Sequence, residues 1–441
     1  MTSAPTHHVA VVGTGYVGLT TGAALASLGH RVVCADIDAE RIDRLRQGHI
    51  PIVEEGLEEM VRAQVSAERL SFASDSAVAV ADADLVFLCV PTPSGPDGRS
   101  DLRYIKAAGA DIREALSTGA VVVNKSTVPV GSTKVVEGVL LRHDISVVSN
   151  PEFLREGTAL HDFLHPDRIV IGADDRRAAE KVASLYASLD APVLITDPAS
   201  AETIKYAANA FLATKISFAN AVAAMCEAVG ADVADVIAGL GSDHRIGPDF
   251  LRPGPGWGGS CLPKDTRALV TIARDYGYDF ALVRGVIAVN EEQRHRVVEK
   301  IRTATGGVLE GATVAVLGLT FKAHTDDLRD SPSIAVVSDL VDAGAKIRAY
   351  DPTVTAPLTR TQQATIGAVA SVLQLCDDAY DACAGADAVV VLTEWPEFAA
   401  LDLDHLAGTV AEGATVIDAR NLLSPDAVRA AGLTYNGIGR R

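Results

Sequence analysis

A glycine pattern near the N-terminus constrains the fold of this chain more than any other feature. Gly13-Thr14-Gly15-Tyr16-Val17-Gly18 follows a short apolar run and opens a stretch with helical character. The first glycine of such a pattern permits a tight turn, the second lets a pyrophosphate approach the backbone, and the third lets the helix pack on the strand. The pattern therefore predicts a strand, a turn and a helix, with a phosphate site at the helix N-terminus.

An acidic residue refines this prediction. Asp36 ends the next predicted strand, 18 residues after Gly18. Its carboxylate can accept hydrogen bonds from the two hydroxyls of a ribose and would repel a 2′-phosphate, which favours NAD over NADP. Arg41 complicates the choice, because an arginine in this region can accommodate a phosphate. We predict NAD as the cofactor; the alternative is a glycine-rich turn in an α/β fold that binds no ligand.

Short Val- and Ile-rich runs alternate with helical stretches at both ends of the chain, which is typical of βαβ units. The runs are apolar throughout, as expected for a parallel sheet covered on both faces. In the first half the predicted strands are Val9–Val12, Val32–Ala35, Leu85–Val90, Val121–Asn124, Ser146–Ser149 and Ile169–Ile171. From Ala312 the pattern returns in TVAVLGL, KIRAYDP, ADAVVVLTEW and ATVIDAR. We predict an α/β fold with two Rossmann-like doubly wound domains; the second lacks the full glycine pattern and should hold a different ligand.

The middle of the chain has a different pattern. AETIKYAANAFLATKISFANAVAAMCEAVG carries a long apolar stripe without proline or internal glycine, which predicts one helix that ends at Gly230 and joins the two ends of the chain. Further helical segments follow it, interrupted by the Gly/Pro-rich stretch RPGPGWGGSCLPKD. We therefore divide the chain into residues 1–200, a helical domain at 201–303, and residues 304–441.

Charge and composition exclude several classes of function. The 39 Lys and Arg against 57 Asp and Glu give a net charge of −18, which disfavours nucleic-acid and anionic-membrane partners. The N-terminus lacks a basic and apolar signal, and no apolar run of about 18 residues is apparent. The six cysteines have no regular spacing, which argues against a disulfide framework or a zinc site. We expect a cytoplasmic protein without a metal.

A cysteine in the Gly/Pro-rich stretch is the strongest candidate for covalent chemistry. In Gly256-Trp257-Gly258-Gly259-Ser260-Cys261 the glycines let backbone approach a ligand closely, and Lys264 and Asp265 supply polar surroundings. Both a nucleophile and a structural cysteine in a loop fit this context.

Three other groups of polar residues have two interpretations each. Lys205 and Asn209 share one face of the long helix, where they could hold an oxyanion or could simply be solvated. The segments STVP, which contains Thr127, and NPEFLREG, at residues 150–157, each follow a strand, where α/β sheets bind ligands, although loop capping is the alternative. Lys322 and Arg329 could bind a phosphate, or they could form ion pairs with Asp326, Asp327 and Asp330.

Taken together, these segments resemble the UDP-glucose 6-dehydrogenase family within the nucleotide-sugar 6-dehydrogenases. The resemblance spans nearly the whole chain and rests on GTGYVGL, VPTP, STVPVG, NPEFLREG, DFLHPDRIVIG, IKYAANAFLATKISFAN, RIGPDFL, GWGGSCLPKD, FKAHTDDLRDSP and LTEWPEF. It implies two Rossmann-like domains joined by a long helix, with NAD bound by the first and the nucleotide sugar by the last. It also implies a homodimer or higher homo-oligomer formed through the central region.

The resemblance implies a metal-free reaction in which two NAD oxidise the C6 alcohol of a sugar to a carboxylate. Cys261 would attack the intermediate aldehyde to give a thiohemiacetal and then a thioester, which water releases as the acid. Lys205 and Asn209 would stabilise the oxyanion. Thr127, Glu152 and Asp265 would position water and move protons, and the resemblance does not assign the base among them.

Motif and resemblance together assign binding roles residue by residue. The cofactor-binding set is Gly13, Gly15, Tyr16, Val17, Gly18, Asp36, Arg41, Pro91, Thr92, Thr127, Glu156, Lys264 and Arg329. The substrate-binding set is Phe153, Leu154, Glu156, Lys205, Asn209, Arg245, Phe250, Gly258, Phe321, Lys322 and Arg420, with Arg245 expected to reach the substrate of a neighbouring subunit. The chain departs from the family at Trp257, where Tyr or Phe is common, and at Glu55, where a proline is expected.

The sequence constrains the sugar of the substrate more tightly than its nucleobase. Ser260 suits glucose-type and GDP-mannose-type members, and STVPVG, DFLHPDR and LTEW favour the glucose type. UDP and TDP differ by one methyl group, which is worth only about 1–3 kcal/mol in a pocket, so TDP-glucose stays an alternative. Two rival functions are a two-electron enzyme of the β-hydroxyacid dehydrogenase type, which would not need Cys261, and a non-catalytic sensor of nucleotide sugars.

Overall fold

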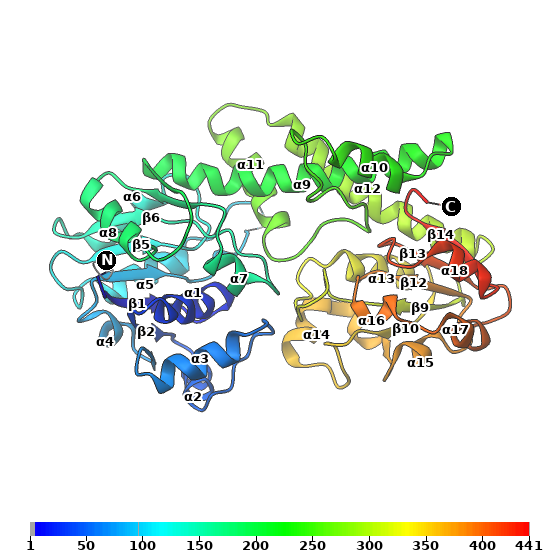
Figure 1. Ribbon diagram of the computed structural model, residues 1–441, viewed down its shortest axis with the longest axis horizontal. Coiled ribbons are helices and arrows are strands. Elements are labelled where there is room, and N and C mark those ends of the chain that lie inside the picture. The colour runs from blue at the N-terminus through cyan, green and yellow to red at the C-terminus, as the bar shows by residue number, and fades with distance from the viewer. Residues whose placement is uncertain (1–4, 96, 441) are drawn as a thin grey trace. The chain divides into compact units, whose positions relative to one another are not determined.

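The computed structural model describes residues 5–95 and 97–440 of the chain (Figure 1). The chain forms two compact units. The N-terminal unit comprises the residues up to Ala208 together with Arg267–Gly277, and the C-terminal unit comprises Asn209–Thr266 and the residues from Tyr278 onward. The division between the units falls within one long helix, so each unit contains part of it. The three-domain division at residues 200 and 303 stays a prediction.

The N-terminal unit is built on an eight-stranded sheet with the order β3-β2-β1-β4-β5-β6-β7-β8. Its strands are β1 (His8–Val12), β2 (Arg31–Ala35), β3 (Leu70–Ala73), β4 (Leu85–Leu88), β5 (Val121–Asn124), β6 (Ser146–Ser149), β7 (Ile169–Gly172) and β8 (Val193–Thr196). Its helices are α1 (Tyr16–Ser27), α2 (Ala39–Arg46), α3 (Leu57–Ser66), α4 (Ser76–Val80), α5 (Arg103–Ile112), α6 (Ser132–Leu140), α7 (Ala159–Leu164) and α8 (Arg176–Ser184). The strand order reverses between β1 and β4, which is the point where open α/β sheets bind ligands.

The sequence predicted six of these strands and missed β3 and β8. Both lie at the edges of the sheet, where burial is incomplete and a continuous apolar run is not required; β8 has no buried residue. The expectation of a parallel sheet is wrong at one point, because β6 and β7 pair antiparallel. The segment between them contains only the short helix α7 and no full crossover helix, so the chain returns in the opposite direction.

The C-terminal unit contains a second sheet with the order β11-β10-β9-β12-β13-β14, and all its pairs are parallel. Its strands are β9 (Thr313–Leu317), β10 (Lys346–Tyr350), β11 (Gln374–Leu375), β12 (Ala388–Val391), β13 (Thr415–Asp418) and β14 (Thr434–Gly437). The order repeats that of the first six strands of the N-terminal sheet. This repetition confirms two Rossmann-like folds.

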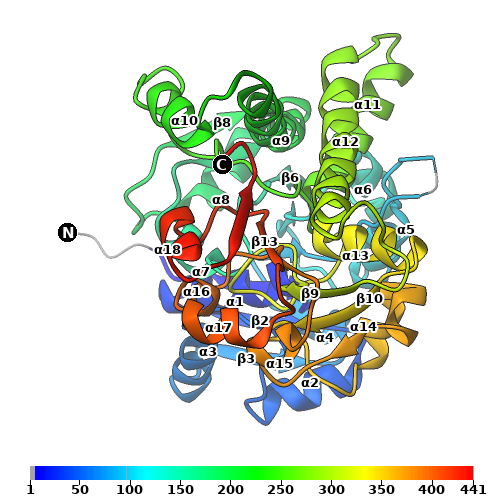
Figure 2. The same cartoon turned by 90° about the vertical axis from the view of Figure 1, so that its right-hand side faces the viewer.

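Helices cover both faces of this second sheet, and each face has its own apolar core (Figure 2). On one face pack α12 (Ala281–Ala304) and α13 (Pro332–Asp342), and on the other pack α15 (Ala379–Cys383), α16 (Pro396–Ala399) and α17 (Leu403–Thr409). The remaining helices are α14 (Arg360–Ile366), a 3₁₀ turn (Gly367–Ser371) and α18 (Pro425–Ala430). Burial of Val314, Val316 and Val390 on one face, and of Ala315, Leu317 and Val389 on the other, explains why these strands are apolar throughout.

The long helix α9 runs over Pro198–Val229, which is 32 residues, and confirms the predicted central helix. It is followed by α10 (Val233–Gly241) and α11 (Leu262–Asp275). Among the described residues, α9 is the one helix long and apolar enough to cross a membrane by length and composition, although buried core helices pass the same test. Polar residues such as Lys205, Lys215 and Asn220 interrupt α9, so it is not the continuous apolar run whose absence the sequence indicated.

Candidate active site

The three glycines of the turn after β1 have two different roles: Gly13 and Gly18 permit close packing, and Gly15 leaves space beside the backbone. A Cβ on Gly13 would lie 2.6 Å from the carbonyl oxygen of Cys89, and one on Gly18 would lie 1.9 Å from the carbonyl oxygen of Gly13. These two glycines are therefore required by the packing of the turn itself. A Cβ on Gly15 would meet no described atom within 4 Å, so the space beside Gly15 is open. That open position, directly before α1, is where the pattern would admit a pyrophosphate.

Asp36 lies at the end of β2 beside this turn. Its Oδ2 accepts hydrogen bonds from the backbone and hydroxyl of Thr14 at 2.7 and 2.8 Å, and Oδ1 accepts one from the backbone of Asp38 at 3.0 Å. Burial raises the pKa of Asp36, but these bonds outweigh burial and hold the pKa below its usual value. Arg41 pairs with Asp36 at 3.3 Å and with Asp38 at 3.7 Å, so a 2′-phosphate would face two carboxylates. Carboxylate acceptors at this position fit the hydroxyls of a ribose, as in NAD.

The VPTP and STVP loops meet within the N-terminal unit. Pro91 and Thr92 follow β4, and the Thr92 hydroxyl donates to the carbonyl of Thr127 at 2.9 Å. Ser126 donates to the carbonyl of Val90 at 2.7 Å. Two segments singled out from the sequence thus meet at one edge of the sheet, after the neighbouring strands β4 and β5 and next to the strand-order reversal.

The NPEFLREG loop places a buried carboxylate beside a buried ammonium. Glu152 and Lys205 are 5% and 3% exposed, and Glu152 Oε1 lies 3.1 Å from Lys205 Nζ. The backbone N–H of Leu154 donates to Glu152 Oε2 at 2.7 Å. Burial by itself raises the pKa of Glu152. The positive charge of Lys205 and the hydrogen bond from Leu154 lower the pKa by a larger amount, so the net shift is downward. Lys205 therefore does not lie on a solvated face.

An aromatic ring borders this ion pair. Lys205 Nζ lies 5.4 Å from the centroid of the Phe153 ring, and the Arg168 guanidinium carbon lies 3.7 Å from it. Arg168 belongs to the DFLHPDR segment, and the sequence analysis gave it no role. Leu154 and Glu156 of the same loop are half-buried.

The structure also shows an anchor that sequence reasoning missed. The Tyr16 hydroxyl, at the start of α1, bonds Glu54, whose carboxylate accepts from the backbone of Gly157 at 2.8 Å and of Leu160 at 3.1 Å. Glu54 thus ties the glycine turn to the NPEFLREG loop. In the sequence, this segment is notable only for Glu55, where the family has a proline.

In the C-terminal unit, Cys261 directly precedes α11. Its side chain is half-buried, and its Sγ lies 3.6 Å from the Ser260 hydroxyl. The carbonyl of Cys261 accepts the backbone N–H of Asp265 at 2.9 Å, which closes the first helical turn. An anion at this position is stabilised by the helix N-terminus.

Asp265 is fully buried in the same turn and holds two predicted site residues. It accepts from Asn209 Nδ2 at 2.6 Å and from Lys264 Nζ at 2.5 Å. Asn209 is 7% exposed, so like Lys205 it does not lie on a solvated face. Because α9 has 3.6 residues per turn, Lys205 and Asn209 lie one turn apart on one side of that helix.

The glycines before Cys261 pack the loop onto the FKAHTDDLRDSP segment. A Cβ on Gly258 would lie 2.1 Å from the carbonyl oxygen of Asp330, and one on Gly259 would lie 2.8 Å from the Phe321 ring. Gly258 is therefore needed for close backbone contact, in addition to any role toward a substrate. This contact fixes the cysteine loop against the segment that follows β9.

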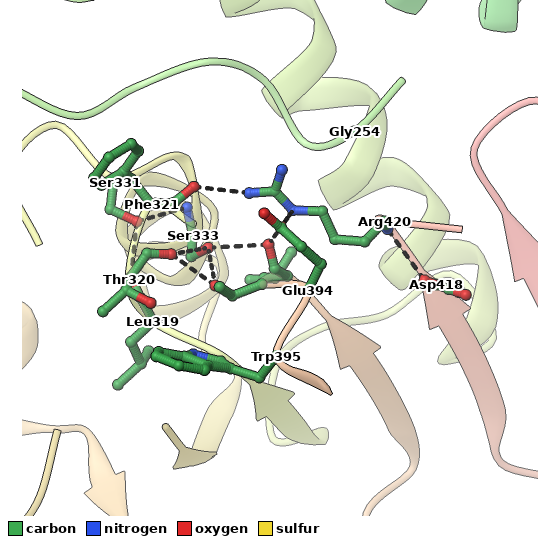
Figure 3. Close-up of polar contacts among 12 residues, drawn as sticks. Gly254, Leu319, Thr320, Phe321, Ser331, Ser333, Glu394, Trp395, Asp418 and Arg420 are labelled. Carbon is green, nitrogen blue, oxygen red and sulfur yellow. Dashed lines mark hydrogen bonds and ion pairs between the residues drawn. The ribbon is translucent and has the colours of Figure 1, made fainter. Parts of the chain in front are cut away.

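Arg420 joins three loops at the carboxyl ends of β9, β12 and β13 (Figure 3). Its guanidinium donates to the carbonyls of Leu392 at 2.8 Å and Phe321 at 2.9 Å and pairs with Glu394 at 2.9 Å. Lys322 Nζ lies 5.5 Å from the Phe321 ring. The position of Arg420 matches the edge where α/β sheets bind ligands.

Two predicted arginines lie on the surface with carboxylate partners. Arg329 pairs with Asp327 at 2.8 Å, and Arg245 pairs with Asp243 at 2.6 Å; Arg245 has a side chain that is 78% exposed. The sequence analysis had given ion pairing as the alternative for Arg329. Phe250 is half-buried and has a positive φ of 61°. In residues 5–95 and 97–440, no group of three His, Cys, Asp or Glu side chains could hold a metal ion.

Comparisons with known proteins agree with this architecture. Three models of the UDP-glucose/GDP-mannose dehydrogenase family match in order: the NAD binding domain at residues 7–190, the central domain at 199–292 and the UDP binding domain at 315–425. A UDP-glucose 6-dehydrogenase of Rhizobium meliloti is 47% identical over 98% of this chain and 99% of its own length. The UDP-glucose 6-dehydrogenase TuaD of Bacillus subtilis is 45% identical over 98% and 93%.

Solved structures show the same likeness. A UDP-glucose dehydrogenase from Pyrobaculum islandicum superposes with a TM-score of 0.90 at 38% identity, covering 100% of this chain and 99% of the other. A UDP-D-ManNAc dehydrogenase from Pyrococcus horikoshii superposes with a TM-score of 0.86 at 28% identity, covering 98% and 99%. By sequence over nearly its full length and by fold, the chain belongs to the UDP-glucose/GDP-mannose dehydrogenase family.

Proposed function

We propose that this chain is an NAD-dependent UDP-glucose 6-dehydrogenase, which oxidises C6 of the glucose to a carboxylate and releases UDP-glucuronate. The observation that carries the proposal is Cys261 at the N-terminus of α11, one turn before the buried Asp265 that holds Asn209. The relatives at 43–47% identity bear the name UDP-glucose 6-dehydrogenase, whereas the N-acetylmannosamine relative is 28% identical.

The N-terminal unit would hold the cofactor through the open backbone at Gly15 and the ionised Asp36. The VPTP and STVP loops lie at the same edge of the sheet and would line its nicotinamide end. A bound NAD would supply the hydride acceptor for each of the two oxidations, so two NAD would be needed for each sugar. The remaining chemistry belongs to side chains of this protein.

The cysteine accounts for a four-electron reaction. Oxidation of the C6 alcohol gives an aldehyde, which has no further hydride to give unless a nucleophile adds to it. The Cys261 thiolate adds to the aldehyde carbon and forms a thiohemiacetal, and removal of the C6 hydride gives a thioester. Water then attacks the thioester, the carbon–sulfur bond breaks, and the thiol and the carboxylate are released.

Buried polar groups supply the charge and proton chemistry. The Lys205 ammonium and the Asn209 amide stabilise the oxygen that becomes negative when the thiolate or water adds. Glu152, Thr127 and Asp265 position the water and accept protons. Our candidates for binding the nucleotide sugar are Phe153, Leu154, Glu156, Phe321, Lys322 and Arg420.

We also propose that two copies associate through α9. The large apolar side chains Phe211, Phe218, Met225 and Val229 are 65%, 55%, 57% and 69% exposed. They recur every seven or four residues, so they form one stripe along the helix. An exposed apolar stripe of this kind marks a protein interface.

The test is the number of NADH formed for each nucleotide sugar consumed, with UDP-glucose and TDP-glucose side by side, for the parent and for Cys261→Ser. We expect two NADH from UDP-glucose and a stalled or trapped intermediate with Cys261→Ser. One NADH, unaffected by loss of the thiol, would instead support the two-electron enzyme. No NADH from either sugar would support the sensor of nucleotide sugars. A preference for TDP-glucose would show that the substrate carries thymine in place of uracil.

A further inference from the structure

A second buried lysine lies next to the proposed catalytic groups and has no assigned role. Lys125 follows β5, two residues before Thr127, and is 5% exposed. Its Nζ donates to Asn150 Oδ1 at 3.1 Å. Among residues 5–95 and 97–440, no carboxylate lies within ion-pair distance of Lys125.

The position of the Lys125 ammonium is fixed by its neighbours. Its Nζ lies 5.8 Å from the centroids of both the Phe163 and the Tyr186 rings. The Tyr186 hydroxyl donates to the same Asn150 Oδ1 at 2.7 Å, and Asn150 Nδ2 donates to the carbonyl of Val170 at 2.8 Å. Asn150 is therefore held in one orientation and presents its oxygen to the ammonium.

Four ionisable groups on other elements surround Lys125: Glu152, Cys89, Lys205 and the phenol of Tyr186. Burial lowers the pKa of Lys125 to about 8, Glu152 and Cys89 oppose that shift, and Lys205 adds to it. Burial also raises the pKa of the Cys89 thiol, to about 12, so Cys89 is neutral near pH 7. Glu152 is then the one buried anion of this group. It pairs with Lys205 at 3.1 Å, and it lies two residues after Asn150, which binds Lys125 at 3.1 Å. A buried cation acts on a nearby carboxylate with little screening by solvent.

We propose that Lys125 is a positioning residue whose charge acts together with that of Lys205 to keep Glu152 ionised. The inference rests on the proposed function, in which Glu152 accepts protons. A protonated Glu152 could neither accept a proton nor form the ion pair that holds Lys205. Lys125 would act through the fixed distance set by Asn150 and the two rings, without touching the substrate.

The test is the pH profile of kcat/KM for UDP-glucose with the full-length protein carrying Lys125→Met. Loss of the charge should raise the apparent pKa of the acid limb by about one unit. The variant should then be about tenfold slower than the parent on the acid side of the limb and close to the parent on its alkaline side. Lys125→Arg, which keeps the charge, should return the limb toward its parental position.

A control and a second variant guard against a purely structural effect. Tyr186→Phe removes the other hydrogen bond to Asn150 and leaves every charge in place, so its acid limb should not move. Asn150→Asp keeps the shape of the site and places a carboxylate on the ammonium. The added negative charge opposes the field of Lys125 at Glu152, so the acid limb should move in the same direction as in Lys125→Met. If Lys125→Met does not fold, Asn150→Asp decides the question.

The inference is overturned if the acid limb of a folded Lys125→Met or Asn150→Asp stays at the parental pH, or if Tyr186→Phe moves it equally. Failure of the proposed function has a different signature, because the parent itself would then not form two NADH for each UDP-glucose. A parent with two NADH and an unmoved limb in the variants would leave the function intact and remove the role of Lys125.

Discussion

Glu202, in the second turn of α9, makes a contact that should control the stability of the N-terminal unit. Its buried carboxylate accepts from the backbone of Gly131 at 2.6 Å, and from the backbone and hydroxyl of Thr133 at 2.9 and 2.8 Å. These donors belong to the first turn of α6, whose N-terminal N–H groups have no partner within the helix. Glu202 therefore caps one helix from another, three residues before Lys205.

The magnitude follows from which donors would be left without an acceptor in Glu202→Ala. The Thr133 hydroxyl can rotate to another acceptor, and water can reach the N–H of Gly131, which is exposed. The backbone N–H of Thr133 is buried and would be stranded, at a cost of about 1–3 kcal/mol. Loss of a negative charge at a helix N-terminus adds about 0.3–1 kcal/mol. Burial raises the pKa of Glu202, so the ionised carboxylate is itself costly to bury, and this reduces the expected net loss to about 2 kcal/mol.

Hydrogen exchange followed by mass spectrometry is the suitable assay, because it reports on α6 directly and does not require the two units to unfold together. Glu202→Ala should increase exchange of the peptide over 131–140 by about 30-fold, which corresponds to about 2 kcal/mol. The matched control is Glu137→Ala. Glu137 is a half-buried glutamate on α6 that pairs with the exposed Lys134, and its loss should cost less than about 0.5 kcal/mol. Equal exchange in the two variants would refute the capping argument.

Three further predictions concern packing, assembly and pH. Gly258→Ala would place a Cβ 2.1 Å from the Asp330 carbonyl oxygen, so it should destabilise the C-terminal unit by about 1–3 kcal/mol in urea unfolding and lower kcat/KM. The control Gly239→Ala adds a Cβ in open space on α10 and should not destabilise this unit. Phe218→Asp should turn a dimer into monomers in analytical ultracentrifugation. Val308→Asp, at a similarly exposed position outside α9, should leave the mass unchanged. The pKa of Lys125 falls from 10.5 to about 8 on folding, so the unfolded chain binds the proton in that window. Stability relative to Lys125→Met should therefore rise with pH from about 8 to 10.5, by at most about 1.4 kcal/mol per unit, and a flat difference in chemical unfolding would contradict this.

The sequence predicted the parts of the site that depend on local chemistry. The glycine turn, the acid after β2 and the cysteine before α11 lie in continuous motifs, so the residue types and spacing suffice. The residues that sequence reasoning missed act on partners far along the chain. Glu54 binds the backbone of Gly157, 103 residues away, and Glu202 binds Thr133, 69 residues away. Lys125 was visible beside Thr127, but its burial depends on rings from two other helical regions, which no local pattern contains.

A contact between residues far apart in the sequence also explains a difference between the two sheets. Their strand orders are alike, but the acidic residues at equivalent positions, Asp36 and Asp351, are not equally accessible. Asp351 follows β10 as Asp36 follows β2, and it likewise accepts from the turn after the first strand, at Leu319 N, 2.8 Å. The indole N–H of Trp395 also donates to Asp351, at 3.1 Å, and Asp351 is 0% exposed. A ribose cannot reach a carboxylate that is fully buried beneath an indole. The C-terminal fold therefore repeats the topology of a dinucleotide site, but Trp395, after β12, covers the carboxylate of Asp351. The ligand that this edge of the sheet can bind is then determined by the cations Arg420 and Lys322.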